Sequence, residues 1–451
     1  MTGVDARTPP TSPPDGRQNG PLNGELGGRL RAEVARRLAE ETSGTDGDGA
    51  TGPAGRSVLG QRIIAEVLEG EAARALAAGR RPLDASTETR VAKGIFDALF
   101  GLGGFQPYLD DPEVESVNAN GCDQVFVQYA GGRRARGWPV AGSDAELIEL
   151  IRAIAARTGA EERRFDRGSP RVSVPLPGGG RLFAVMAVTS AGRPCAAVRR
   201  DRLAAATLAD LLRNGTVDRQ LAAFLAALVK ARKNILISGG TTIGKTTLLR
   251  ALASAIPPAE RLITIEDSLE LCLDHDTAAH PDVVALQARE PNTEGEGEIT
   301  LAELVRWALR MTPDRVVVGE VRGAEVVPML NAMSQGNDGS MTTLHASSSR
   351  GAFMKLAAYA AQTNEHLSLE DTNLLIAGAV HFVIQVAWDT AGRRCVSSVR
   401  EVTDADGRQV VSNEVYAPGP DRRAVASVPV RAATMEELAA AGYQPPGQGQ
   451  S

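Results

Sequence analysis

The sequence predicts an α/β protein with two folded domains, the second of which is built on a mostly parallel sheet. From about residue 216 to residue 388, apolar strand patterns alternate with helical patterns, as expected for a parallel sheet flanked by helices. Short alternating runs between residues 114 and 198, around one helix at 147–156, indicate a smaller α/β domain before it. A glycine-rich loop follows the apolar strand at 234–238 and precedes a helix, which supports the assignment of the second domain.

Composition divides the chain into four segments. We expect a disordered N-terminal extension at 1–57, a helical and α/β domain at 58–210, a sheet-based domain with short C-terminal strands at 216–432, and a flexible tail at 443–451. Within the extension, residues 30–41 have the pattern of a short charged helix. Residues 213–216, Arg-Asn-Gly-Thr, are expected to be the hinge between the two domains.

The bulk composition is that of a globular protein and argues against several classes. Hydrophobic residues make up 43% of the 451 residues, the net charge is −6, and only 4% of residues are aromatic. Surfaces that bind nucleic acid are usually basic or aromatic, so we expect no nucleic acid partner. The four cysteines form no C-x-x-C pair, so neither zinc nor a disulfide framework is expected. No apolar signal core is present and the longest apolar run, 374–388, is too short to span a bilayer, which predicts a cytoplasmic protein.

Residues 239–246, Gly-Gly-Thr-Thr-Ile-Gly-Lys-Thr, match the phosphate-binding loop pattern G-x-x-x-x-G-K-[ST]. In such a loop, backbone N–H groups surround phosphate oxygens, and the N-terminus of the following helix adds its positive dipole end. Lys245 is expected to reach the β- and γ-phosphates, and the Thr246 hydroxyl is expected to hold Mg²⁺. The expected nucleotide-binding residues are Gly239, Gly240, Thr241, Thr242, Ile243, Gly244, Lys245, Thr246 and Thr247. The loop therefore predicts an ATP site.

Three further segments place chemically active residues at the ends of apolar strands. The strand at 262–266 ends in Glu266, and such a carboxylate can hold Mg²⁺ waters or orient an attacking water, although acids are also common in first helical turns. A β-branched strand ends at Glu320, with Gly319 where many NTPases carry aspartate. His345 follows a loop of small residues and a strand. In isolation such a histidine is more often structural, but this order and spacing favour a phosphate-sensing role.

The four segments together resemble the signatures of the secretion-superfamily ATPases of type II and type IV systems, most closely the CpaF branch of tight-adherence pili. In that family they are called Walker A, Asp box, Walker B and His box, and here they fall at 239–246, 265–270, 316–320 and 336–345. The resemblance extends from about residue 112 to residue 402. It implies a RecA-like second domain and a Mg²⁺-dependent ATPase that works as a homohexameric motor. It also implies an inner-membrane platform protein as partner and a location at the inner face of the cell membrane.

The resemblance further implies roles for individual residues. Arginines of the first domain should stabilise the charge on the transferred phosphoryl group, and Arg181 and Arg199 match the family's positions best. Arg164 and Arg193 are weaker candidates. The remaining roles fall to the acids: we expect Glu266 to orient the attacking water and Glu320 to hold the Mg²⁺ water shell, although the two roles could be exchanged.

The sequence departs from the family pattern at several positions. Thr242 and Ile243 stand where the family loop usually has Gly and Ser, and β-branched residues resist positive φ. Asn337 stands where the His box commonly has a first histidine, and Val172–Val174 lacks the family's aspartate. These departures leave open a slow or non-catalytic nucleotide-binding assembly factor of the same system, and a nucleic-acid translocase of a conjugation system is the other alternative.

Overall fold

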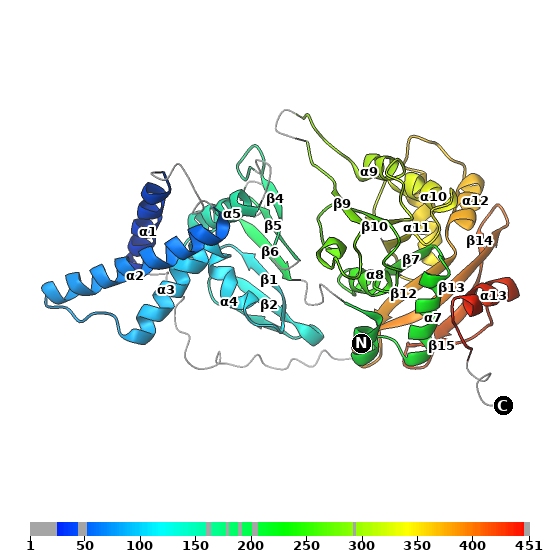
Figure 1. Cartoon of the computed structure of the whole chain (residues 1–451), viewed down its shortest axis with the longest axis horizontal. Coiled ribbons are helices and arrows are strands. Elements are labelled where there is room, and N and C mark those ends of the chain that lie inside the picture. The colour runs from blue at the N-terminus through cyan, green and yellow to red at the C-terminus, as the bar shows by residue number, and fades with distance from the viewer. Residues whose placement is uncertain are drawn as a thin grey trace. The chain divides into compact units, whose positions relative to one another are not determined.

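The chain divides into two compact units, Met1–Arg202 and Leu203–Ser451 (Figure 1). The computed structural model describes residues 25–43, 52–158, 164–176, 180–187, 192–200, 206–291 and 295–445. Both units contain helices and strands, so the predicted α/β class is confirmed. The boundary between the units precedes the expected one, because Leu208–Arg213 is a helix that packs against helices of the second unit.

Three helices open the first unit: α1 (Glu25–Ser43), α2 (Pro53–Ala77) and α3 (Ala85–Phe100). Their apolar faces form one cluster, in which Leu30 and Val34 of α1 are almost fully buried. The expectation of disorder over 1–57 is therefore wrong for α1, because its i, i+4 apolar pair is covered by the other two helices. Residues 1–24 and 44–51 of the expected extension lie outside the described residues.

A six-stranded antiparallel sheet completes the first unit, in the order β3-β2-β1-β6-β5-β4. The strands are β1 (Val114–Asn120), β2 (Val125–Tyr129), β3 (Arg134–Arg136), β4 (Arg171–Pro175), β5 (Gly180–Val185) and β6 (Cys195–Arg200). The other elements are η1 (Gly103–Phe105), α4 (Gln106–Leu109), η2 (Ala130–Gly132) and α5 (Asp144–Thr158). Leu182 and Val198 lie on the buried face, in one cluster with Ile151 of α5. Alternation along the strands leaves the other face open.

The second unit is built on a nine-stranded sheet with the order β15-β14-β13-β12-β7-β11-β10-β8-β9. Its strands are β7 (Ile235–Gly239), β8 (Leu262–Glu266), β9 (Val283–Gln287), β10 (Arg315–Val321), β11 (Met341–His345), β12 (Phe382–Trp388), β13 (Arg394–Ala405), β14 (Val410–Pro418) and β15 (Ala424–Ala426). Neighbours are parallel from β12 through β9 and antiparallel from β12 through β15. The predicted mostly parallel sheet is confirmed, and its strands β7 and β8 are buried along their whole length because helices cover both faces.

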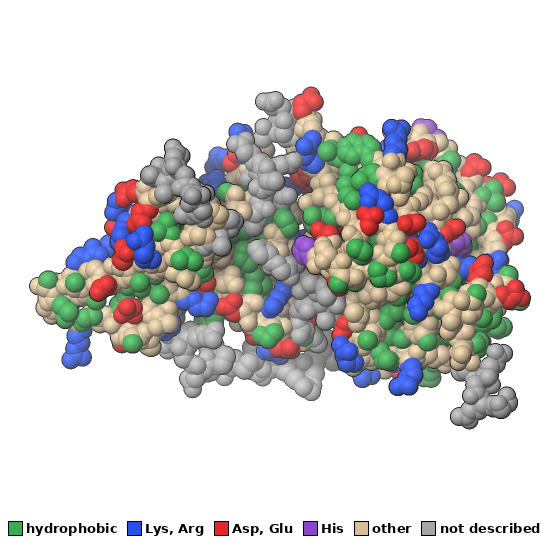
Figure 2. All heavy atoms as spheres, in the orientation of Figure 1, with side chains coloured by type: hydrophobic (Ala, Val, Ile, Leu, Met, Phe, Trp, Pro, Cys, Tyr) green, Lys and Arg blue, Asp and Glu red, His purple; other side chains and the backbone are tan. Residues whose placement is uncertain are grey.

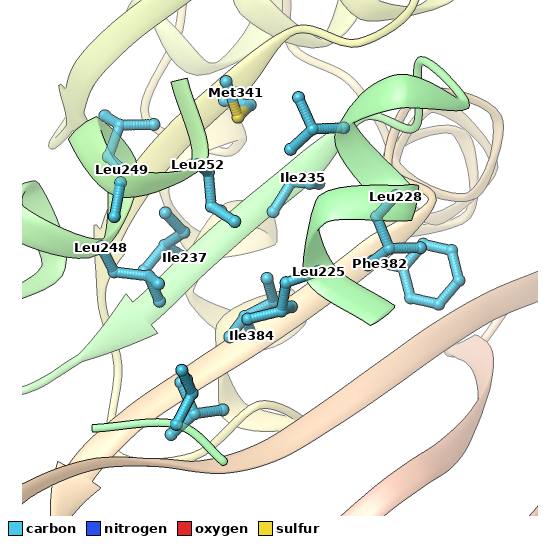
Figure 3. Close-up of a cluster of buried hydrophobic side chains, with 14 of the residues drawn as sticks. Leu225, Leu228, Ile235, Ile237, Leu248, Leu249, Leu252, Met341, Phe382 and Ile384 are labelled. Atoms are coloured by element: carbon cyan, nitrogen blue, oxygen red, sulfur yellow. The ribbon is translucent and has the colours of Figure 1, made fainter. Parts of the chain in front are cut away.

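Two apolar clusters sandwich this sheet. The helices are α6 (Leu208–Arg213), α7 (Arg219–Lys230), α8 (Lys245–Ala253), α9 (Leu301–Ala308), α10 (Val326–Ser334), α11 (Gly351–Ala360), α12 (Leu369–Ala379) and α13 (Ala432–Ala440), with a 3₁₀ helix η3 (Leu273–His275). Figure 3 shows Leu248 of α8 beside Ile237 of β7, and Leu225 of α7 beside Ile384 of β12. The helices from α9 to α12 contribute the second cluster. The rigid sheet between them is what fixes the strand ends that carry the motifs.

The C-terminal part of the chain is more ordered than predicted. β13 and β14 are long strands that extend the main sheet, and α13 was missed altogether. Tyr443 is only 7% exposed and belongs to the core, so the expectation of a flexible tail is wrong for this residue. Residues 446–451 lie outside the described residues. The core extends this far because α13 packs on α7.

The expected hinge at 213–216 is also wrong. The Val396 N–H donates to the Thr216 carbonyl at 3.1 Å, and Arg423 donates to the carbonyl of Gly215. These bonds join the turn to the C-terminal strands of its own unit, and the turn lies inside that unit rather than at the boundary between the two units.

The surface mixes charges of both signs. On the face drawn in Figure 2, basic and acidic side chains are interspersed over both units, in keeping with the net charge of −6. Within the described ranges, no helix has both the length and the apolar character needed to cross a bilayer.

A buried ion pair lies at the amino ends of the strands of the main sheet, opposite the ends that carry the motifs. Arg315, at the start of β10, is fully buried and binds Glu260 through two hydrogen bonds of 2.7 Å each. Replacing Glu260 by alanine leaves this arginine buried without a counter-charge, so we expect a loss of about 3–5 kcal/mol in the free energy of unfolding. The measurement is denaturant unfolding of the full chain. The control Glu436→Ala, on the exposed face of α13, should change stability by less than about 0.5 kcal/mol, and equal losses in both variants would contradict the prediction.

Candidate functional site

The four motifs meet at one edge of the main sheet. Because β7, β11, β10 and β8 are neighbouring parallel strands, their carboxyl ends lie side by side. His345 pairs in register with Gly239, and Val318 pairs with Ile265. The glycine loop, His345, Glu320 and Glu266 therefore lie at the same edge, although up to a hundred residues separate Lys245 from His345 in sequence.

The loop between β7 and α8 depends on unusual backbone conformations. Gly244, at the N-cap of α8, has φ = 104°, a value that favours glycine. Thr242 has φ = 58° although its side chain is β-branched, which makes it a strained position. Ile243 is 3% exposed and anchors the loop in the core, where a Cβ on Gly239 would lie 2.8 Å from its Cγ2. Of the two departures from the family pattern, Thr242 strains the loop and Ile243 fastens it.

The strain at Thr242 can be measured by replacing it with glycine. Relief of the left-handed conformation is worth about 1–2 kcal/mol, while the greater freedom of glycine in the unfolded chain costs up to about 1 kcal/mol. We therefore expect Thr242→Gly to leave the free energy of unfolding unchanged or raised. The neighbouring control Thr241→Gly, exposed and without positive φ, should lower it by about 0.5–1 kcal/mol. Equal destabilisation of the two variants in denaturant unfolding would show that Thr242 is not strained.

Lys245, His345 and Glu320 form a connected chain of polar groups. Lys245 Nζ donates to the Gly240 carbonyl at 3.0 Å and lies 3.0 Å from His345 Nδ1. His345 Nε2 lies 2.7 Å from Glu320 Oε1, and Lys245 Nζ lies 3.8 Å from the same oxygen. Burial lowers the pKa of His345, Glu320 opposes this, and Lys245 and Arg322 reinforce it. A neutral His345 can accept from Lys245 at Nδ1 and donate to Glu320 at Nε2.

Glu266 lies deepest in the site. It is 4% exposed, and its Oε1 accepts hydrogen bonds from the backbone N–H groups of Glu270 and Leu271, both at 3.0 Å. Its Oε2 is buried and has no hydrogen-bond partner among the described residues. Burial raises the pKa of Glu266 to about 7, against the lowering effect of the two backbone donors. A buried carboxyl with one unsatisfied oxygen and a pKa near neutrality has the properties of a general base.

The side chain of Glu266 explains why position 319 is a glycine. A Cβ placed on Gly319 would lie 2.9 Å from Glu266 Cγ, so a residue with a side chain cannot occupy this position without moving the glutamate. The acid that many NTPases carry at the position of Gly319 is therefore replaced in space by an acid from the neighbouring strand β8.

Two arginines of the site were missed in the sequence. Arg322 Nε donates to Glu320 Oε2 at 2.8 Å, and its guanidinium lies 3.0 Å from Asp267 Oδ2, so it links two acidic strand ends. Arg250 of α8, 2% exposed, donates to the Leu271 carbonyl and holds the loop that follows Glu266. Two patterns in the sequence could have indicated them. For Arg322 it is the i, i+2 spacing from Glu320, and for Arg250 it is a lone charge within an apolar helix.

Asn337 lies away from these residues. It precedes β11, at the opposite end of the strand from His345, and β11 alone spans about 13 Å from Met341 to His345. Its Nδ2 donates to the Pro313 carbonyl at 2.7 Å, which is a structural bond. The position of Asn337 therefore gives no support to the expectation that it bears on hydrolysis.

Arg181 and Arg199 belong to the first unit, whereas the residues described above belong to the second. The two arginines pair in register on β5 and β6, and the buried neighbours Leu182 and Val198 place them on the open face of that sheet. Strand alternation assigns further arginines and two exposed phenylalanines to this face: Arg134, Arg136, Arg171, Phe126 and Phe183. The face is therefore suited to binding an anion.

The two weaker arginine candidates differ from this pair. Arg193 is engaged by Asp144 and Asp123 at 2.7 Å each, and hydrogen bonds to these carboxylates raise its pKa. Arg164 is exposed and precedes β4. Neither lies on the strands that carry Arg181 and Arg199.

The oxygen donors at the loop fit Mg²⁺. The Thr246 hydroxyl and the Glu320 carboxylate are hard oxygen ligands of the kind that this ion prefers. In the part of the chain that the structure describes, no three His, Cys, Asp or Glu side chains gather as a ligand group. A magnesium ion here would therefore depend on phosphate oxygens and water for the rest of its shell, as is usual for nucleotide sites.

Comparisons with known proteins converge on a single family. The family model described as Type II/IV secretion system protein matches residues 107–439, which include all four motifs together with Arg181 and Arg199, but not the helices α1 to α3. A putative conjugal transfer protein of Mycobacterium tuberculosis (strain H37Rv) is 38% identical over 317 residues, which cover 69% of this chain and 87% of that protein. Protein VirB11 of Rhizobium radiobacter is 31% identical over 294 residues, covering 59% and 82%. The solved structure of the VirB11 ATPase from the Brucella suis type IV secretion system is 29% identical, with a TM-score of 0.36 and coverage of 66% and 92%.

Proposed function

Because the chain belongs to the Type II/IV secretion system protein family, we propose that it is an ATP-hydrolysing motor of a secretion or pilus-assembly system. The observation that carries the proposal is the convergence of Lys245, His345, Glu320 and Glu266 beside the phosphate loop. Phosphoryl transfer depends mainly on positioning and on electrostatic stabilisation, and these residues supply a cation, a histidine and two acids at one strand edge.

Each residue has a defined task in this proposal. The backbone N–H groups of the loop and Lys245 bind the phosphates, so Lys245 must exchange its bond to the Gly240 carbonyl for a phosphate oxygen. Glu266 orients and deprotonates the attacking water through its unpartnered Oε2, which points to it rather than Glu320 as the base. His345 contacts both Lys245 and Glu320, and it senses whether the γ-phosphate is present. Thr246 and Glu320 would hold Mg²⁺, which when bound neutralises charge on the phosphates.

The finer parts of the proposal concern assembly and partners. Arg181 and Arg199 act as arginine fingers on the γ-phosphate, supported by their adjacent positions on an open sheet face. The chain forms a homohexamer and works on an inner-membrane platform protein from the cytoplasmic side. Within the family we assign it to the tight-adherence pilus branch, on the motifs quoted above. A slow or non-catalytic assembly factor of the same system is the alternative that the strained Thr242 favours.

A second candidate function is nucleic-acid translocation. It is favoured by the arginines and the exposed Phe126 and Phe183 on the open face of the first sheet, because aromatic and basic side chains together bind single strands. Relatives named as conjugal transfer proteins point the same way. The excess of acidic residues over the whole chain argues against it.

The first test measures phosphate release from ATP by the purified full chain in the presence of Mg²⁺, with and without single-stranded DNA. The second is native mass spectrometry of the same protein in the presence of an ATP analogue. The motor proposal predicts steady turnover that DNA does not change, and a ring of six. Turnover that DNA stimulates several-fold would favour translocation. A strictly monomeric protein under these conditions would contradict the motor.

A further inference from the structure

A tryptophan and an arginine lie beside the phosphate loop on the side away from the acids. β12 is the neighbour of β7, with Val386 in register with Gly239, so Trp388 ends β12 at the level of the loop. Arg394 opens β13 and pairs in register with Trp388. Its guanidinium carbon lies 5.2 Å from the centre of the indole ring, which is a cation–π contact.

Arg394 also touches the loop itself. Its Nη2 donates to the Thr242 carbonyl at 3.4 Å, and a Cβ built on Gly244 would lie 3.5 Å from its Cδ. The indole is 38% exposed although Ile384 and Val386, on the same side of β12, are buried in the core. Trp388 and Arg394 therefore form a partly exposed aromatic and cationic surface next to the loop, on the side of β12 that packs into the core.

The order of the strands fixes which end of a bound nucleotide faces this surface. β11, β10 and β8 lie on one side of β7 and carry His345, Glu320 and Glu266, where the attacked γ-phosphate must lie. β12 lies on the other side of β7. With the phosphates in the loop and the γ-phosphate toward the acids, the nucleoside leaves the loop toward β12.

We propose that Trp388 and Arg394 form a platform on which the nucleobase of the bound nucleotide stacks. The proposal rests on the proposed function, since it requires a nucleotide in the loop. A planar base is recognised by an aromatic face and by a guanidinium plane, and such stacking depends little on hydrogen-bond pattern. The ligand class is a purine nucleoside di- or triphosphate, because a larger ring system stacks more strongly.

The test compares ADP with pyrophosphate, which has the phosphates without the base. Trp388→Ala should weaken ADP binding about 5- to 150-fold, the effect expected for the loss of one base-stacking contact, and should leave pyrophosphate binding unchanged within twofold. Trp388→Phe should restore most of the ADP affinity. The matched control Trp307→Ala removes another exposed tryptophan, 47% exposed on α9, and should alter neither ligand. Isothermal titration of the full chain measures all of these affinities.

Fluorescence gives an independent readout. Trp138, Trp307 and Trp388 are the only tryptophans of the chain, so Trp138→Phe with Trp307→Phe leaves Trp388 as the sole emitter. ADP should quench its emission and pyrophosphate should not. If Trp388→Ala weakens both ligands equally, or if ADP binds without changing the emission, the platform is overturned while the nucleotide site stands. If the wild-type chain binds neither ligand, both the platform and the proposed function are wrong.

Discussion

Replacing Arg181 or Arg199 by alanine is expected to lower kcat for ATP about 10³- to 10⁵-fold, the effect typical of an arginine finger. The two residues pair in register on β5 and β6, so their guanidinium groups can converge on one phosphoryl group. They would act on charge that develops only in the transition state, so ADP affinity should change much less than kcat. Steady-state phosphate release and ADP titration on the same variants measure the two effects.

Arg81→Ala is the control for this pair. Arg81 is an exposed arginine of the same unit, in the segment between α2 and α3, and it does not belong to the sheet that carries Arg181 and Arg199. It should retain wild-type turnover. If Arg181→Ala and Arg199→Ala also retain it, the first unit does not contribute to catalysis and the arginine assignment is wrong.

Glu266→Gln is expected to lower kcat about 10²- to 10⁴-fold, the usual contribution of a general base. Glutamine keeps a carbonyl oxygen for the N–H groups of Glu270 and Leu271, so the loop after β8 should remain in place. Glu320→Gln should also reduce turnover, chiefly by weakening the response to Mg²⁺. Asp274→Asn, an exposed acid in η3, is the control and should behave as wild type. Wild-type rates in both glutamate variants would contradict the assignment.

The pH dependence gives a second readout for Glu266. Burial raises its pKa from 4.5 to about 7, so kcat/KM should rise with pH through about 7 as the base ionises. Glu266→Gln should remove that inflection. Because the folded-state pKa is raised, the contribution of Glu266 to stability is fully present below the unfolded value of 4.5 and is lost as pH rises through about 7. Between pH 4.5 and about 7, the free energy of unfolding should therefore fall less in Glu266→Gln than in the wild type.

The features that follow from local sequence pattern could be predicted from the sequence. Strand and helix periodicity predicted the α/β class, and the motifs predicted that Glu266, Glu320 and His345 lie at the ends of apolar strands, which β8, β10 and β11 confirm. What it could not predict depends on contacts between distant segments. Gly319 is explained only by the side chain of Glu266 on another strand, and Asn337 is removed from the site by the direction of β11.

The errors have the same origin. Residues 213–216 have the composition of a hinge, but bonds from Val396 and Arg423 fix them to strands that follow much later in the chain. The tail composition suggested flexibility from residue 443, yet Tyr443 packs against Phe224. The role of Arg322 could not be predicted, because its bonds to Glu320 and Asp267 connect the ends of two separate strands.

The central claim is that the Lys245 loop hydrolyses ATP, and comparison of the wild-type chain with Lys245→Ala tests it most directly. The measurement is steady-state phosphate release at saturating ATP and Mg²⁺. We predict turnover that saturates with ATP in the wild type and falls to background in Lys245→Ala, because the variant loses the cation that binds the β- and γ-phosphates. Phosphate release that is equal in the two proteins, or no release above background in the wild type, would contradict the account.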